Sequence, residues 1–500
     1  MQAHSSLPLG VIEANRAVLL KKTIDLLKMK KIALMLFFVV IAGIAGAAGS
    51  NYSGNWLVYL LFTIIANSLL INGFRRRALF FDTFIGIFLW LGFWLKFSLR
   101  MALNQAAFGD ALAFDGSPEA FDLALIVSSC GLAALLLASV VRGRFFAYPN
   151  EVPACNSSGL FLFYRRYRFQ CVAFFLAMVM LVATSNAWLG IYQRGMVAQT
   201  VLPYGLNSVY KWLLQFGLAS LSALIVRFEI ELNRNLTLMA VVPALLESFL
   251  SNVSLLSRGM ILNSAGLAFG GTRLLSSMKV RVGFLRAAAI AISFAVLFVA
   301  SVLTVNFLRA MSYDDAVAVS PQPAPSATTI KHMTVPLFLD RWIGIEGVVA
   351  VSSSKTLGWE LWREAWQERF REGELSIYDK RFVDTPYAAN PDASKFHFVS
   401  LPGIVAFLYF PGSLVFLFVA LTFCGLLASV IEIATYRYAG KNWVLCSLVA
   451  QVIAYRYAHF GYVPAQSYLL FGTLALNVAI LFVADRLLRR FLAAPIMQAQ

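Results

Sequence analysis

Long apolar runs, separated by short polar or charged segments, repeat along almost the whole chain. A helix needs about 20 mostly apolar residues to cross a hydrocarbon core of about 30 Å. Runs that fit this length lie near residues 32–48, 56–73, 79–99, 121–141, 171–193, 210–228, 235–255, 284–306, 401–431, 443–459 and 467–485. A further run, 259–275, is shorter and contains Asn263, Ser264 and four glycines, so hydropathy alone leaves its crossing open.

Basic residues decide how this short run is interpreted, because each added span moves everything after it to the other side of the membrane. If residues 259–275 cross, 25 of the 41 Lys and Arg residues fall on short segments of one side. Without that crossing, the last two basic clusters fall on the opposite side. Since cytoplasmic segments carry an excess of Lys and Arg, we predict about twelve transmembrane helices with both termini in the cytoplasm.

The amino-acid composition supports a membrane protein and excludes several other classes of protein. Hydrophobic residues make up 60% of the chain and charged residues 13%, with a mean hydropathy of +0.73, whereas about a quarter of the residues in soluble domains are charged. A soluble enzyme and a disordered chain are therefore excluded, and no nucleic-acid partner is expected because dense basic tracts are missing. The five cysteines show no CxxC spacing, so neither a disulfide framework nor a metal site is predicted.

One connection has the composition of a globular segment. Residues 306–400 hold 12 of the 25 acidic residues and 10 of the basic residues that lie outside the cytoplasmic set, which predicts a folded periplasmic loop. The chain then divides into an N-terminal bundle of about nine spans (1–305), this loop (306–400) and a C-terminal group of about three spans (401–500). The predicted fold class is an all-α integral membrane protein with about 12 transmembrane helices.

Within the loop, residues 356–373 are predicted to form an amphipathic helix that ends at Gly373. Its aromatic residues recur three and four positions apart: Trp359, Trp362, Trp366 and Phe370. A stripe of this kind either lies among the lipid headgroups or packs on the protein itself, and the sequence leaves both interpretations open.

The loop also holds candidates for chemistry. Arg341 and Trp342 are adjacent, a pairing suited to a phosphate or to the face of a sugar, and Glu346 follows between two glycines. His332 and His397 lie in the same loop, and histidine accepts a proton near neutral pH. Each of these residues also has a structural interpretation, as a member of an ion pair or as a surface residue.

Charged residues within or at the ends of predicted spans are costly and therefore candidates for function. Lys96 and Arg100 share a helix face at the outer end of the third span, and Arg456 lies at the outer end of the eleventh. Arg258 lies in a tight turn between the seventh and eighth spans. The alternative explanation is that such side chains extend to lipid headgroups. Cations gathered beneath an outer loop suit an anionic, membrane-anchored substrate such as a lipid diphosphate.

The Ser257-Arg258-Gly259 turn, the number of spans and the large late loop together resemble the O-antigen polymerase and ligase group of bacterial membrane proteins, which includes the oligosaccharide repeat unit polymerases. The resemblance implies a membrane-embedded glycosyltransferase of the bacterial inner membrane. It would move a glycan from an undecaprenyl diphosphate donor onto another lipid-linked repeat unit at the periplasmic face, and so assemble a surface polysaccharide.

The resemblance also gives the candidate residues their roles. Arg258 would hold the diphosphate. The full set of diphosphate or glycan-binding candidates is Arg258, Arg341, Arg100, Lys96, Arg456 and Trp342. The candidates for the general base are Glu346, His332 and His397. No cofactor is expected, and the expected partners are the lipid-linked oligosaccharide, the lipid bilayer and a chain-length regulator protein.

Three alternatives stay open. A ligase that transfers the glycan to the lipid A core has the same chemistry with a different acceptor. A transporter or flippase of lipid-linked sugars would show an internal repeat and a polar pathway, and the two halves of the chain show no such repeat. Glycosyltransferases that use a polyprenyl monophosphate sugar commonly place an acidic residue in the first outer loop, and here that loop, 49–55, has none. The second outer loop carries Asp110, Asp115 and Glu119, so this alternative also stays open.

Overall fold

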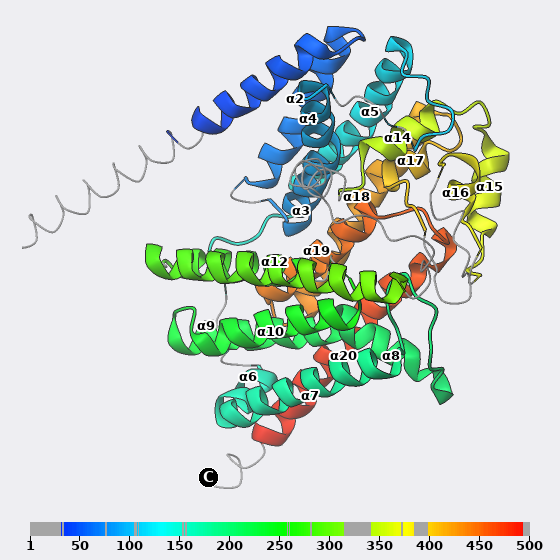
Figure 1. The fold of residues 1–500 in the computed structure, drawn as a ribbon. Coiled ribbons are helices and arrows are strands. Elements are labelled where there is room, and N and C mark those ends of the chain that lie inside the picture. Colours follow the sequence, from blue (N-terminus) through cyan, green and yellow to red (C-terminus); the bar gives the residue numbers. More distant parts are fainter. Residues whose placement is uncertain are drawn as a thin grey trace, which may run out of the picture.

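The structure is a computed structural model, and it describes residues 32, 35–75, 78–104, 108, 110–152, 155, 158–257, 259, 261–280, 283–314, 342–371, 374–384 and 399–493. Within these residues the regular elements are helices, and an isolated β-bridge pairs Ala111 with Val383. Eight helices of this part are long and apolar enough to cross a membrane (Figure 1). The prediction of an α-helical membrane protein is confirmed at this level.

The eight helices are Trp56–Gly73, Phe80–Ala102, Pro118–Gly143, Arg168–Leu189, Pro203–Asn233, Ala287–Leu308, Leu414–Tyr438 and Pro464–Leu492. Three shorter apolar helices are Met35–Asn51, α10 (Leu238–Ser254) and α19 (Trp443–Ala458). The short run at 259–275 corresponds to α11 (Leu262–Ser277), a helix of 16 residues. Every predicted apolar run therefore contains a helix, while twelve crossings go beyond the eight that length and hydropathy support.

Two long helices change their pitch part of the way along. Helix Phe80–Ala102 consists of α3 (Phe80–Leu89), the π-helical segment η1 (Trp90–Leu95) and α4 (Lys96–Ala102). The other consists of η2 (Pro203–Gly205), α8 (Leu206–Trp212), the π-helical η3 (Leu213–Gly217) and α9 (Leu218–Asn233). Single π-helical turns are rare and recur at functional sites, so both segments point to regions of interest.

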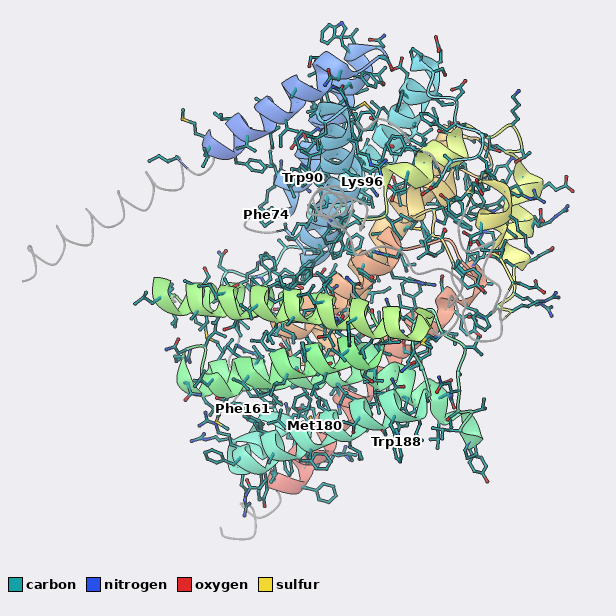
Figure 2. The ribbon with its side chains drawn as sticks, viewed as in Figure 1. Phe74, Trp90, Lys96, Phe161, Met180 and Trp188 are labelled. Atoms are coloured by element: carbon teal, nitrogen blue, oxygen red, sulfur yellow. The ribbon has the colours of Figure 1, made fainter. Side chains whose placement is uncertain are left out.

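The buried apolar side chains form two clusters. The larger joins α2 (Trp56–Gly73), α3, α5 (Pro118–Gly143), α11, α18 (Leu414–Tyr438) and α19. The smaller joins α6 (Gly159–Arg166), α7 (Arg168–Leu189), η3 and α9. In Figure 1, α7, α10 and α12 (Phe284–Asp314) lie side by side in one half, with α2, α3 and α5 in the other. Trp188 on α7 is 86% exposed (Figure 2), as suits a side chain that faces lipid.

Four short helices gather at one end of the bundle (Figure 1). They are α14 (Ile345–Ser352), α15 (Trp359–Gln367), α16 (Ile377–Arg381) and α17 (Ile404–Leu408). α14 is almost wholly buried and packs against α5 and α17. The connection between α4 and α5 joins this group, because Leu112 donates its backbone N–H to the carbonyl of Phe382 at 3.1 Å.

The aromatic stripe of α15 packs on the protein itself. The ring centroid of Trp362 lies 5.0 Å from that of Phe407 on α17 and 5.0 Å from that of Phe416 on α18. Trp359 also contacts Phe416, at 5.0 Å, but remains 60% exposed. The stripe therefore anchors α15 to the bundle and leaves one edge of the helix uncovered.

The predicted length of that helix was wrong. The prediction ran over 356–373, whereas α15 ends at Gln367 and Glu368 is extended. The carboxylate of Glu368 accepts the backbone N–H groups of Ile377 at 2.7 Å and Val463 at 3.1 Å. These distant partners draw the chain out of the helix. Gly373, the expected end, lies outside the described residues.

The prediction of one continuous span at 401–431 was also wrong. α17 ends at Leu408, and α18 begins at Leu414 after a turn in which Gly412 has a φ of 74°. The Ser413 hydroxyl caps α18 by accepting the N–H of Phe416 at 3.3 Å. Gly412 is needed here because a positive φ is costly for residues with a Cβ. The spanning helix consequently starts at the turn and extends to Tyr438.

Candidate functional site

The candidate site is built around an ion pair between Lys96 and Glu346. The Lys96 ammonium donates to the Glu346 Oε1 at 2.6 Å and to the carbonyl oxygen of Trp342 at 2.9 Å. The Lys96 side chain is 2% exposed, and that of Glu346 is 33% exposed. Lys96 begins α4, and Trp90 begins η1 on the same long helix (Figure 2). A buried cation is thus paired with a glutamate side chain that is one-third exposed, although its Oε2 atom is buried.

Local backbone geometry explains how these residues meet. Lys96 is the first residue of α4 and follows the π-helical segment η1 directly. Gly92 in η1 lies against the backbone of Ile343 and Gly344, and a Cβ on either glycine would collide with backbone atoms of the other segment. Two segments far apart in the sequence can therefore approach at main-chain distance only because both positions are glycine.

The second carboxylate oxygen of Glu346 is available for a further interaction. Oε2 is buried and has no hydrogen-bond partner within the described part of the chain. Glu346 belongs to the first turn of α14, where the helix dipole favours a negative charge. Tyr378 on α16 lies nearby, and its burial, together with the charges of Glu346 and Asp379, raises the pKa of its hydroxyl. The hydroxyl thus stays protonated beside a carboxylate that can accept a proton or a hydrogen bond.

A chain of aromatic rings connects this ion pair to the turn at residues 257–259. Trp342 is stacked on Phe88 with 6.1 Å between ring centroids, and the edge of Phe88 meets Tyr455 at 6.0 Å. Tyr455 in turn stacks on His459 at 4.0 Å. Gly259 lies against the Tyr455 hydroxyl, where a Cβ would collide with it. The aromatic chain therefore links the loop that carries Glu346 to Gly259, which follows the residue predicted to hold a diphosphate.

Further cations lie on the other side of that turn. Arg194 donates its backbone N–H to the carbonyl of Leu255 at 2.9 Å, and its charge is close enough to interact with that of Arg456. Tyr192 accompanies them and accepts a hydrogen bond from the Gln215 amide at 3.2 Å. Gln215 belongs to η3, so the second π-helical segment also faces this region.

Arg194 was missed in the sequence analysis. It is the single charged residue of the connection 190–205, and that isolation is the signal that would have identified it. Tyr378 was missed as well, and nothing in its sequence surroundings distinguishes it from a residue of an ordinary amphipathic turn.

The structure describes some of the predicted site residues and brings only part of them together. The structure brings together Lys96, Trp342 and Glu346, with Arg456 across the aromatic chain. Arg100 lies over the ring of Phe108, with its guanidinium carbon 4.9 Å from the ring centroid. Arg258, Arg341, His332 and His397 lie outside the described residues, and their roles stay predictions.

Among the described residues, no group of three or more His, Cys, Asp or Glu side chains is arranged to hold a metal ion. The described part of the site consists of buried or half-buried cations, the partly exposed side chain of Glu346 and a wall of aromatic rings. This combination can bind an anionic group and accept a proton from a neighbouring hydroxyl. Comparisons with protein family models, curated proteins and solved structures give no match.

Proposed function

We propose that the protein is a membrane-embedded glycosyltransferase that polymerises undecaprenyl-diphosphate-linked oligosaccharide repeat units into a surface polysaccharide. The observation that supports this most directly is the chain of ring contacts from Trp342, whose carbonyl accepts from the Lys96 ammonium, to Tyr455 beside Gly259. The Lys96–Glu346 pair supplies a carboxylate for proton transfer, and Arg194 and Arg456 supply cations, as the transfer of a glycan away from a diphosphate requires.

The proposed reaction divides these residues into two groups. Arg258, Arg194 and Arg456 hold the diphosphate and stabilise the negative charge that grows as it leaves. Glu346 accepts the proton of the acceptor hydroxyl, whose oxygen forms a bond to the anomeric carbon of the donor sugar. The bond from that carbon to the diphosphate breaks, and undecaprenyl diphosphate is released. His332 and His397 are the other candidates for the base.

Lys96 is proposed as a positioning residue. Because its ammonium holds both Glu346 Oε1 and the carbonyl of Trp342, it fixes the loop and the orientation of the Glu346 carboxylate. Arg341 would assist from the same loop, and the face of Trp342 would contact a sugar ring.

We further propose the bacterial inner membrane as the location, with twelve crossings and both termini in the cytoplasm. In this arrangement α14 to α17 lie on the periplasmic side, where lipid-linked repeat units are assembled into polymer. A chain-length regulator would contact this same side.

Reconstitution tests the proposal. The purified protein in liposomes is given a synthetic undecaprenyl-diphosphate-linked repeat unit, and the products are separated by size. A polymerase gives a ladder of lipid-linked products and releases undecaprenyl diphosphate. Product formed only after addition of lipid A core would identify a ligase, and transfer across the bilayer without a new glycosidic bond would identify a flippase. Either result would overturn the proposal.

A further inference from the structure

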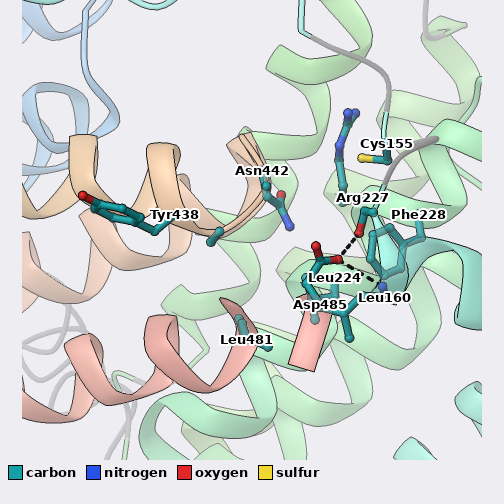
Figure 3. Close-up of a pocket in the computed structure, with 12 residues that line it drawn as sticks. Cys155, Leu160, Leu224, Arg227, Phe228, Tyr438, Asn442, Leu481 and Asp485 are labelled. Carbon is teal, nitrogen blue, oxygen red and sulfur yellow. Dashed lines mark hydrogen bonds between the residues drawn. The ribbon is translucent and has the colours of Figure 1, made fainter. Parts of the chain in front are cut away.

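A second pocket lies away from the candidate site, where α9 and α18 end and α19 begins (Figure 3). It holds about 430 Å³ of space, part of it open to solvent. Arg227, Asn442 and Asp485 are its principal polar lining, and one wall is apolar. In the twelve-span arrangement this end of the bundle faces the cytoplasm.

Asn442 places an unused hydrogen-bond donor in this pocket. It is the N-cap of α19, and its Oδ1 accepts the backbone N–H groups of Val444 at 3.0 Å and Leu445 at 3.1 Å. Those two bonds fix the orientation of the carboxamide and assign its other atom as nitrogen. Asn442 is 3% exposed, and Nδ2 has no hydrogen-bond partner within the described ranges. A buried donor without an acceptor costs free energy. A ligand that accepts a hydrogen bond from Nδ2 would remove this cost.

The charges around the pocket favour an anion. Arg227, wholly buried, pairs with Glu231 on its own helix at 3.1 Å. The Asp485 carboxylate is already engaged, since it accepts the Ser158 hydroxyl at 2.6 Å (Figure 3) and pairs with Arg489 at 3.7 Å. The N-terminus of α19, a helix of 16 residues, adds a positive dipole. A donor, a buried guanidinium and a helix N-terminus thus line the pocket, and the carboxylate that also lines it is engaged with other partners.

The apolar part of the lining is formed by Leu224, Phe228 and Leu481. A free anion would gain nothing from such a wall, whereas the acyl chain of a lipid would bury surface on it. Basic side chains near the cytoplasmic leaflet also attract anionic headgroups.

We propose that this pocket binds a phosphate group, carried by an anionic phospholipid of the cytoplasmic leaflet. The phosphate oxygens accept from Asn442 Nδ2 and interact with Arg227 and the N-terminus of α19, and one acyl chain lies along the apolar wall. Free inorganic phosphate shares the same recognition chemistry and is the other source of such a group. The proposal does not depend on the enzymatic activity.

The test uses the full-length protein in a neutral detergent. Phosphatidylglycerol, inorganic phosphate and diacylglycerol, which has no phosphate, are titrated separately, and bound lipid is counted by native mass spectrometry. Asn442→Asp keeps the oxygen that caps α19 but replaces the donor with a negative oxygen. Asn442→Ser also keeps a capping oxygen, removes the donor and adds no charge, so it serves if the Asp variant fails to fold. Asn235→Asp makes the same charge change outside the pocket and is the matched control.

We expect saturable binding of phosphatidylglycerol to the wild type and to Asn235→Asp, no binding of diacylglycerol, and affinity lower by roughly tenfold or more in Asn442→Asp. If inorganic phosphate binds with the same dependence on Asn442 and displaces the lipid, the phosphate chemistry is supported and the free anion is the ligand. Binding that is equal in all variants, or binding of neither phosphate compound to the wild type, would overturn the proposal.

Discussion

Lys96 Nζ and Glu346 Oε1 lie 2.6 Å apart although 250 positions separate the two residues in the sequence. The ammonium is buried within the bundle, and the carboxylate is one-third exposed. Because the two side chains are buried to different extents, removing one charge should lower the free energy of unfolding by a different amount from removing the other.

The ion pair predicts an asymmetric double-mutant cycle for stability. Glu346→Gln removes the carboxylate that pairs with the buried ammonium and should cost about 3 kcal/mol. Lys96→Met leaves a charge on a side chain that is one-third exposed, so the cost should be smaller, about 1–2 kcal/mol. The double variant removes both charges, and its free energy of unfolding should lie within about 1 kcal/mol of that of the wild type. Thermal unfolding in detergent measures the series, and equal losses in both single variants would contradict the assigned burial.

Gly92 predicts a steric effect on the same loop. Gly92→Ala should separate η1 from Ile343 and Gly344, because the new Cβ meets backbone that cannot rotate away. We expect a loss of about 1–3 kcal/mol in unfolding free energy and loss of the Lys96–Glu346 contact. Gly472→Ala on α20 (Ser467–Ala493) is the control, since a Cβ there has nothing within 4 Å. It should be neutral or stabilising, and a comparable loss in both variants would exclude the specific contact.

The contact between Gly259 and Tyr455 predicts that a second substitution can restore activity lost by a first. Gly259→Ala directs a Cβ at the hydroxyl of Tyr455, whose ring is held by stacking on His459 and by the edge of Phe88. The variant should displace the turn and lower activity. Adding Tyr455→Phe removes the nearest obstructing atom, the hydroxyl oxygen, but leaves the ring carbon Cζ at 2.7 Å from the new Cβ, so it should restore part of the activity. Tyr455→Phe alone should have little effect. A double variant as impaired as Gly259→Ala would show that this contact does not position the turn.

If α11 crosses the membrane, residues 204 and 279 lie on opposite sides of it, and cysteine labelling can test this. Tyr204 is fully exposed between α7 and α8, and the side chain of Lys279, just after α11, is 83% exposed. In a background without the five native cysteines, Tyr204→Cys should react with a membrane-impermeant thiol reagent from outside. Lys279→Cys should react only after permeabilisation. If both positions react from the same side, α11 does not cross and the count of twelve spans is wrong.

Much of the helical framework could be predicted from apolar runs, because in a bilayer each helix must satisfy its own backbone. The turn before α18 was also readable, since Pro411 and Gly412 are adjacent in the sequence. The early end of α15 could not be predicted, because Glu368 binds backbone N–H groups of Ile377 and Val463, which lie beyond the helix. The apolar pattern likewise contains no sign of η1, although that segment determines where Lys96 lies.

The site was predicted only in part for a related reason. Lys96 and Glu346 could each be selected as charges in unusual places, yet their pairing depends on tertiary contacts between Gly92 and Gly344. Arg100 shares the helix with Lys96, and periodicity placed both on one face. Arg100 lies over the ring of Phe108, a contact between a cation and an aromatic ring that sequence spacing does not reveal.

The measurement that tests the central claim most directly is chain growth by the Lys96→Met, Glu346→Gln double variant in liposomes supplied with the synthetic lipid-linked repeat unit. Its fold should be close to that of the wild type, whereas loss of the general base should lower polymer formation by about 10²–10⁴-fold. A stable double variant that produces the wild-type ladder would contradict the account, because Glu346 would then be a structural partner of Lys96 and not the group that accepts the proton.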